Sequence, residues 1–150
     1  MERKPQFFIL YLLVSFASVG AVIISPAMPA IGAYFHLSNM GAKGVLMIYL
    51  LGYALGELPY GPLANRFGRK IAVFIGATTA SVGAIFCVLS AFHYMYWLLV
   101  LGIFIMGLGA AVGLGLALAI IGDSYTVDES ARKTSLVTSS FAIMPAIFVV

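Results

Sequence analysis

The chain has 150 residues, of which 63% are hydrophobic and 9% are charged, and its formal net charge is +3 at pH 7. Because a soluble domain carries about 25% charged residues, this composition excludes a water-soluble globular domain, a disordered chain and a coiled coil. A single cysteine excludes an internal disulfide, and the small net charge gives no indication of nucleic-acid binding. The class that remains is a membrane protein with several spans.

Long apolar runs predict transmembrane helices along the whole chain. A helix needs about 20 apolar residues to cross a membrane, and the runs here are continuous, unlike the alternating strands of a β-barrel. We therefore expect an all-α membrane protein with about five transmembrane helices and short connections. The predicted spans are residues 7–31, 44–63, 71–92, 95–121 and 134–150.

The two terminal spans each allow an alternative. Arg3 and Lys4 precede the first span, as in a signal peptide, but its apolar stretch is too long and more spans follow, which favours a retained helix. The last span stops in apolar sequence at Val150. This ending predicts a partial chain of a larger protein, and a genuine five-helix protein is the alternative.

The basic residues predict the orientation of the chain. One side of the predicted topology carries seven of them and the other side carries only Lys43. Because cytoplasmic segments are enriched in Lys and Arg, we expect the amino terminus to be cytoplasmic in a multi-pass protein of the cytoplasmic (inner) membrane. Tyr94, Tyr96 and Trp97 would then lie at the outer interface. The seven residues are Arg3, Lys4, Arg66, Arg69, Lys70, Arg132 and Lys133.

Small residues recur at a spacing of four in three of the spans. In membranes such residues mark the places where helices approach closely, and prolines within or near spans favour kinks. We expect close packing at Gly52 and Gly56, at Gly76, Ala80 and Ala84, and at Gly109 and Gly113, with kinks at Pro26, Pro29, Pro59 and Pro145.

Glu57 is the only acidic residue well inside a predicted span. A charge at membrane depth costs about 2.5–3.5 kcal/mol, so it usually faces a cavity or a partner, and a carboxyl that gains and loses a proton suits proton coupling. Tyr49, Tyr53 and Tyr60 share its helical face and are candidate cavity-lining residues. The alternative is that Glu57 bonds a neighbouring helix and the tyrosines are core.

The remaining polar residues predict no enzyme chemistry. No paired carboxylates with a nucleophile, phosphate-binding loop or Cys/His cluster is present, and His36 and His93 are isolated. The intramembrane hydroxyl groups are expected to bond local helix carbonyls; they belong to Ser15, Ser18, Ser25, Thr78, Thr79 and Ser81. We therefore expect no enzymatic activity, no cofactor and no metal.

Residues 61–70 resemble the signature loop of the major facilitator superfamily. Residues 25–31 and 53–63 resemble the bicyclomycin-resistance type of drug:proton antiporter, and residues 107–111 resemble part of its fourth-helix motif. The resemblance implies a partial six-helix bundle, the first five helices of a twelve-helix carrier. The loop positions that match are Gly61, Leu63, Asn65, Arg66, Gly68, Arg69 and Lys70.

The resemblance also implies a charge latch in which Arg69 pairs with Asp123. Asn65 stands where the family has Asp, and we expect it to cap the following helix. Glu57 replaces a residue that is usually Gln. The first-helix Asp and the fourth-helix Arg and Gln of these antiporters fall at Val22, Ile103 and Met106.

These features predict a secondary active transporter that exports small amphipathic molecules or drugs, with proton antiport as its energy source. The expected partners are a small-molecule substrate, the lipid bilayer and protons, without nucleic acid, and the complete protein is expected to be a monomer. One alternative is a carrier of another solute, a siderophore or a metabolite, without proton coupling. Another is a membrane fragment that does not transport.

Overall fold

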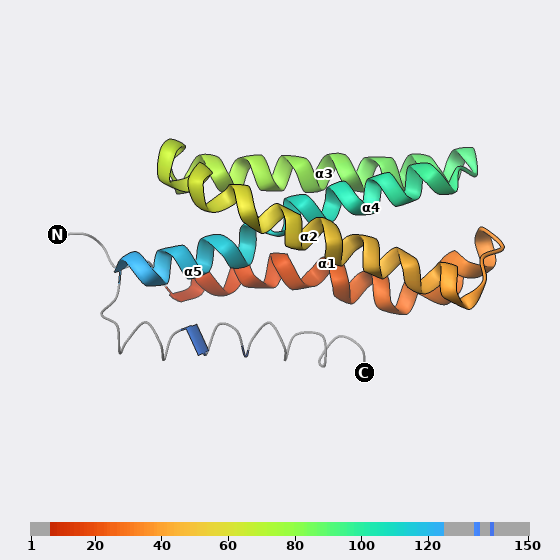
Figure 1. The fold of residues 1–150 in the computed structure, drawn as a ribbon, viewed down its shortest axis with the longest axis horizontal. Coiled ribbons are helices and arrows are strands. Elements are labelled where there is room, and N and C mark those ends of the chain that lie inside the picture. The colour runs from red at the N-terminus through yellow and green to blue at the C-terminus, as the bar shows by residue number, and fades with distance from the viewer. Residues whose placement is uncertain (1–6, 125–133, 136–138, 140–150) are drawn as a thin grey trace.

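The structure, a computed structural model, describes residues 7–124, 134, 135 and 139. It contains the helices α1 (Phe7–Tyr34), α2 (Asn39–Phe67), α3 (Arg69–His93), α4 (Tyr96–Ala110) and α5 (Val112–Ser124). Successive helices run up and down the bundle, and α5 continues in the direction of α4 (Figure 1). No strand occurs in this part of the chain, and the all-α prediction is confirmed.

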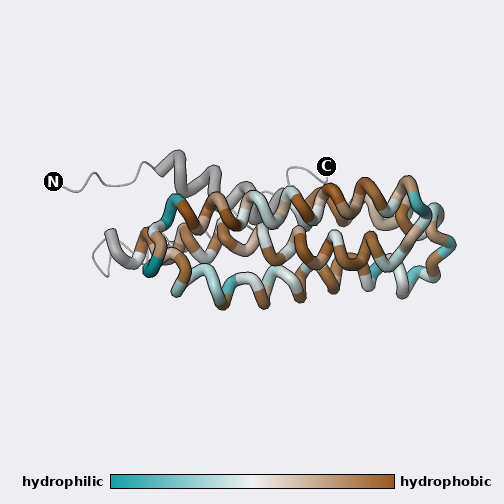
Figure 2. The backbone as a smooth tube through the Cα atoms, turned by 90° about the horizontal axis from the view of Figure 1, so that it is seen from above, coloured by the Kyte–Doolittle hydropathy of each residue, from teal (hydrophilic) through white to brown (hydrophobic). Residues whose placement is uncertain are grey.

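The first three helices contain the predicted spans 7–31, 44–63 and 71–92. Three stretches of the described chain are long and apolar enough to cross a membrane, namely Asn39–Phe67, Arg69–His93 and Tyr96–Gly122, and α1 contributes the shorter apolar stretch Val22–Tyr34. The predicted fifth span lies almost wholly outside the described residues. Hydrophobic residues follow the helices along their length (Figure 2), as expected for a chain surrounded by lipid.

Specific residues set the helix boundaries. The Ser38 side chain accepts a hydrogen bond of 3.2 Å from the Gly41 amide and so caps the start of α2. Gly68, with φ of 89°, is the single residue between α2 and α3, and this backbone conformation favours glycine. The predicted capping by Asn65 is wrong, because α2 continues to Phe67 and the position before α3 belongs to Gly68.

The fourth predicted span, residues 95–121, corresponds to the single apolar stretch Tyr96–Gly122, which has a one-residue break at Ala111. Ala111 separates α4 from α5, and its amide donates to the Gly107 and Gly109 carbonyls. Proline does not cause this break, because residues 96–124 contain none; the prolines of α1 and α2 lie inside continuous helices. Glycine is the weakest helix former apart from proline, and Gly107, Gly109, Gly113 and Gly115 surround the break.

Glycines bring α4 into backbone contact with α2 and α3. A Cβ added at Gly56 would lie 2.5 Å from the Leu108 carbonyl oxygen, and one at Gly83 would lie 2.6 Å from the Gly102 oxygen. Gly76 likewise adjoins Gly109, which confirms the predicted close packing of these helices. Ala84, however, is exposed, and Gly83 makes the contact instead. Because an α-helix has 3.6 residues per turn, residues on one face are spaced by either three or four positions.

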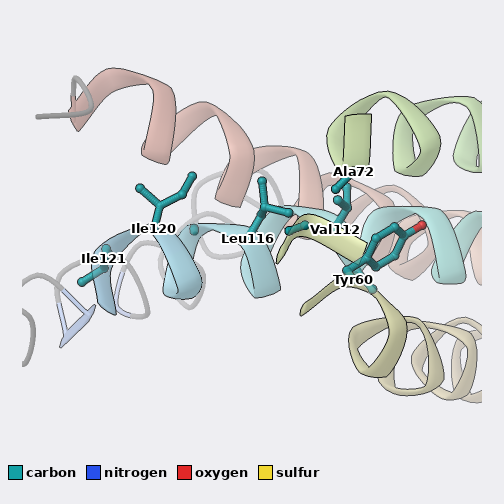
Figure 3. Close-up of a cluster of buried hydrophobic side chains, with 9 residues drawn as sticks. Tyr60, Ala72, Val112, Leu116, Ile120 and Ile121 are labelled. Atoms are coloured by element: carbon teal, nitrogen blue, oxygen red, sulfur yellow. The ribbon is translucent and has the colours of Figure 1, made fainter. Parts of the chain in front are cut away.

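The core consists of two clusters that meet at the break in the fourth span. The first cluster is built around α4 and includes Ile24, Val45, Tyr49, Leu99, Ile103 and Ala110. The second is built around α5 and includes Tyr60, Ala72, Ala111, Val112, Leu116, Ile120 and Ile121; Figure 3 shows this cluster. Tyr53 packs against both clusters.

Candidate functional site

The signature loop forms the turn from α2 into α3. Leu63 packs against the second core cluster and anchors the end of α2, whereas Asn65, Arg66, Arg69 and Lys70 are exposed. The Arg66 guanidinium lies 5.4 Å from the centre of the Phe67 ring, within the range of a cation–π contact. The turn therefore presents three cations at one end of the bundle. Gly68 is the only residue between the two helices, and the chain reverses its direction there.

The two ends of the expected charge latch lie at the same end of the bundle. Arg69 begins α3, and α5 ends next to the position of Asp123, at the same end as the α2–α3 turn (Figure 1). The Asp123 side chain lies outside the described side chains. Pairing of Arg69 with Asp123 therefore stays a prediction, and the topology of the helices is compatible with it.

The three tyrosines of α2 lie at helix–helix contacts. Tyr49 is only 1% exposed, and its hydroxyl packs directly on the backbone of Gly20 in α1. Tyr53 lies beside it, with 6.4 Å between the ring centres, and Tyr60 is buried in the second core cluster, where it interacts with the Thr79 side chain. These residues bind the helices of this bundle to one another, and their part in lining a cavity stays a prediction.

Glu57 lies at the edge of this tyrosine face and is exposed. Its carboxyl interacts electrostatically with Tyr53, one turn earlier on α2. The neighbouring Leu58 is 73% exposed, so the acid sits on an outward surface that is otherwise apolar. The structure thus brings Glu57 next to Tyr53 and separates it from the buried Tyr49.

The two positions where the resemblance would place a first-helix acid and a fourth-helix base hold buried apolar residues. Val22 and Ile103 are both buried, and Ile103 belongs to the first core cluster together with Leu99. Met106 packs against the same cluster. Among the side chains described by the structure, Glu57 is the only carboxyl, so it has no acidic neighbour there with which to share a proton.

The hydroxyl groups of α3 make local bonds, as predicted. Thr78 donates to the Phe74 carbonyl at 2.9 Å, Thr79 to the Ile75 carbonyl at 2.8 Å and Ser81 to the Ala77 carbonyl at 2.8 Å. No group of three potential metal-ligating side chains occurs in the described part of the chain.

One feature at the opposite end of the bundle is not predicted by the sequence. A hollow of about 460 Å³ lies between the end of α1 and the start of α2, with Lys43 and Asn39 in its wall. Its only signal in the sequence is that Lys43 is the single basic residue among the connections of that end.

Comparison with known proteins identifies a family match over most of the chain. The family model of the Major Facilitator Superfamily matches residues 10–150. An uncharacterized transporter of Schizosaccharomyces pombe is 28% identical over 142 residues, which is 92% of this chain and 28% of that protein. The MFS-type transporter oryF of Aspergillus oryzae is 31% identical over 128 residues, 85% of this chain and 26% of the relative.

A bacterial relative is named for drug resistance. The multidrug resistance protein MdtL of Escherichia coli is 29% identical over 142 residues, which is 91% of this chain and 36% of that protein. The chain thus spans roughly a quarter to a third of the length of these curated relatives. No solved structure matches the chain.

Proposed function

Because the chain belongs to the major facilitator superfamily, we propose that it forms part of a secondary active transporter that exports small amphipathic molecules across the cytoplasmic membrane in exchange for protons. The multi-pass helical fold and the family match support a transporter. The drug class is supported by the similarity to a multidrug resistance protein, and by the segments that resemble drug:proton antiporters.

The observation that carries the proton coupling is the position of Glu57. It precedes Phe67, the end of α2, by ten residues, or about 15 Å at 1.5 Å per residue. This is half the thickness of a hydrocarbon core of about 30 Å. A charged group at such depth is expensive in lipid, and it usually faces protein or a water-filled cavity. We therefore place the Glu57 side of α2 on an aqueous pathway, where the carboxyl can exchange protons.

The signature loop and the latch complete the proposal. With the amino terminus cytoplasmic, the cations of the α2–α3 turn lie at the cytoplasmic surface, where anionic lipid attracts them. In the proposed latch, Arg69 pairs with Asp123 in one state of the carrier and releases it in the other. Tyr49 and Tyr60 are buried and hold the helices together. Tyr53 interacts with Glu57 and is therefore the tyrosine nearest to the proposed pathway.

A second function is favoured by one observation. Val22 and Ile103 are apolar and buried, at the positions where the resemblance would place a first-helix acid and a fourth-helix base. A carrier of a siderophore or metabolite that is not coupled to protons would need neither group. The two functions differ in their response to a proton gradient.

The test is transport by the full-length protein in proteoliposomes. Antiport predicts that ethidium accumulates when the lumen is acidic, and that a protonophore abolishes this accumulation. A rate of solute uptake that changes neither with the proton gradient nor with the protonophore would favour the second function. Empty liposomes and liposomes with heat-inactivated protein control for dye partitioning.

A further inference from the structure

The hollow between α1 and α2 combines a cationic rim with an apolar wall. Its volume is about 460 Å³, and its wall includes Met28, Pro29 and Ala33 of α1, Leu37 of the turn, and Asn39 and Lys43 of α2. Sites that bind small molecules commonly have volumes of about 300–1,000 Å³ and mostly apolar walls with a few polar groups. The hollow therefore has the size and composition of a site for an amphipathic molecule with an anionic group.

The charge of Lys43 is not balanced by the described part of the chain. Glu57 is the only carboxyl among the described side chains, and it lies 14 positions further along α2, about 21 Å away along the helix axis. This distance is more than two Debye lengths at physiological ionic strength. Within the described part of the chain, Lys43 is therefore a cation with no carboxylate near it, and an anionic group bound in the hollow would supply the counter-charge.

The surroundings place the hollow at the boundary between lipid and water. Trp97 is 81% exposed at the start of α4, and Tyr94 is exposed at the end of α3, both at the end of the bundle that holds the α1–α2 turn (Figure 1). Such rings favour the level of the lipid headgroups. Met40 and Met47 of α2, on either side of Lys43 along the helix, are largely exposed apolar side chains. An anion that binds here is therefore flanked by surface suited to acyl chains.

We propose that this hollow binds the phosphate headgroup of an anionic phospholipid. The Lys43 ammonium and the Asn39 amide donate hydrogen bonds to the phosphate oxygens, and the glycerol backbone with the first part of the acyl chains lies against Met28 and Pro29. A free anion would gain nothing from the apolar wall. The combination of charge and apolar surface thus selects the lipid over inorganic phosphate.

The experiment measures lipid binding by the purified full-length protein. Phosphatidylglycerol is titrated in detergent, and bound lipid is counted by native mass spectrometry for the wild type and for Lys43→Gln, Lys43→Arg and Ala33→Phe. Phosphatidylcholine, which has no net charge, is the lipid control, and inorganic phosphate is the competitor. Leu58→Gln is the control variant, because it changes an exposed residue of α2 that lies 15 positions beyond Lys43 and outside the hollow.

The proposal predicts that Lys43→Gln weakens phosphatidylglycerol binding about fivefold, the effect expected of one basic residue near an anionic headgroup. Lys43→Arg stays within about twofold of the wild type. Ala33→Phe keeps every charge but fills the hollow, and it weakens binding by a similar factor to Lys43→Gln. Phosphatidylcholine binds more weakly than phosphatidylglycerol, and inorganic phosphate does not compete.

Three results would overturn the proposal. Unchanged binding by Lys43→Gln would show that the lysine makes no contact with the headgroup. Unchanged binding by Ala33→Phe would show that Lys43 attracts lipid from the open surface without a pocket. Competition by millimolar inorganic phosphate would assign the hollow to a free anion. A variant that loses binding because it misfolds would also lose thermal stability and helical circular dichroism, whereas Leu58→Gln is expected to keep both its fold and its lipid binding.

Discussion

The Tyr34 hydroxyl donates a hydrogen bond of 2.7 Å to the Ala91 carbonyl, and so joins the end of α1 to the end of α3 across 57 residues of sequence. The Tyr34 ring also lies 4.4 Å from the centre of the Tyr94 ring. Phe35 continues the cluster, at 6.0 Å from both Tyr94 and Tyr96. Aromatic contacts therefore hold together the end of the bundle where the α1–α2 and α3–α4 turns lie.

Tyr34→Phe is expected to lower the free energy of unfolding by about 0.5–1.5 kcal/mol, because it removes one hydrogen bond and keeps the ring contacts. Thermal unfolding of the full-length protein in detergent measures the change. Tyr94→Phe is the matched control, since it also removes one hydroxyl from the same cluster. An equal loss of stability in both variants would show that the hydrogen bond from Tyr34 to Ala91 makes no specific contribution.

Gly109→Ala is expected to destabilise the bundle by about 1–3 kcal/mol, because overpacking forces the backbone to shift. A Cβ at this position would lie 2.5 Å from the Gly76 carbonyl oxygen and against the Ala80 amide. At Gly115 no atom lies within 4 Å of an added Cβ, and Gly115→Ala is expected to be neutral or to stabilise by about 0.5–1 kcal/mol. Thermal unfolding of the two variants side by side tests the packing, and the reverse order would contradict it.

Glu57→Gln is expected to preserve expression and to weaken proton-driven transport, or to flatten its dependence on pH. Glutamine keeps the size and hydrogen bonding of the side chain but cannot exchange a proton. Substrate efflux by the full-length protein against an imposed proton gradient measures the effect, and Leu58→Gln, on the neighbouring exposed position, is the control. Identical rates and pH profiles in wild type and Glu57→Gln would reduce Glu57 to a structural residue.

Charge reversal tests the proposed latch. Arg69→Glu and Asp123→Arg are each expected to impair transport, and the double variant is expected to recover part of it, because the opposite charges are restored in exchanged positions. The measurement is a double-mutant cycle on transport rate. A double variant that equals the sum of the two single losses would leave Arg69 with a role in topology or lipid contact only.

Cysteine labelling tests the orientation of the chain. In a Cys87→Ser background, an impermeant maleimide added outside the cell is expected to modify Met40→Cys but not Phe67→Cys. Both side chains are exposed at opposite ends of α2, and substitution of Met40 leaves the helix-capping Ser38 intact. Labelling of Phe67→Cys alone would reverse the proposed topology.

Much of the architecture follows from composition and local pattern. Continuous apolar runs between charged connections are enough to locate α1, α2 and α3, because lipid requires every backbone bond of a span to be satisfied within a helix. Gly52, Gly56, Gly76 and Gly109 are recognisable as contact points for a related reason, since close helix approach in lipid requires small residues. The signature motif of residues 61–70 is local as well, and its residue types alone indicate the family.

Tertiary structure alone decided which neighbour each helix face meets. Periodicity placed Glu57 with three tyrosines on one face, but the contacts of α2 with α1 and α4 bury Tyr49 and leave Glu57 outside. The one-residue break at Ala111 lies where the two core clusters meet, and the apolar sequence of this span does not predict it. The hollow beside Lys43 exists because α1 and α2 approach across a turn. Hydrophobicity specifies burial in a membrane, whereas side-chain shapes from separate helices determine where the packing is tight and where space remains.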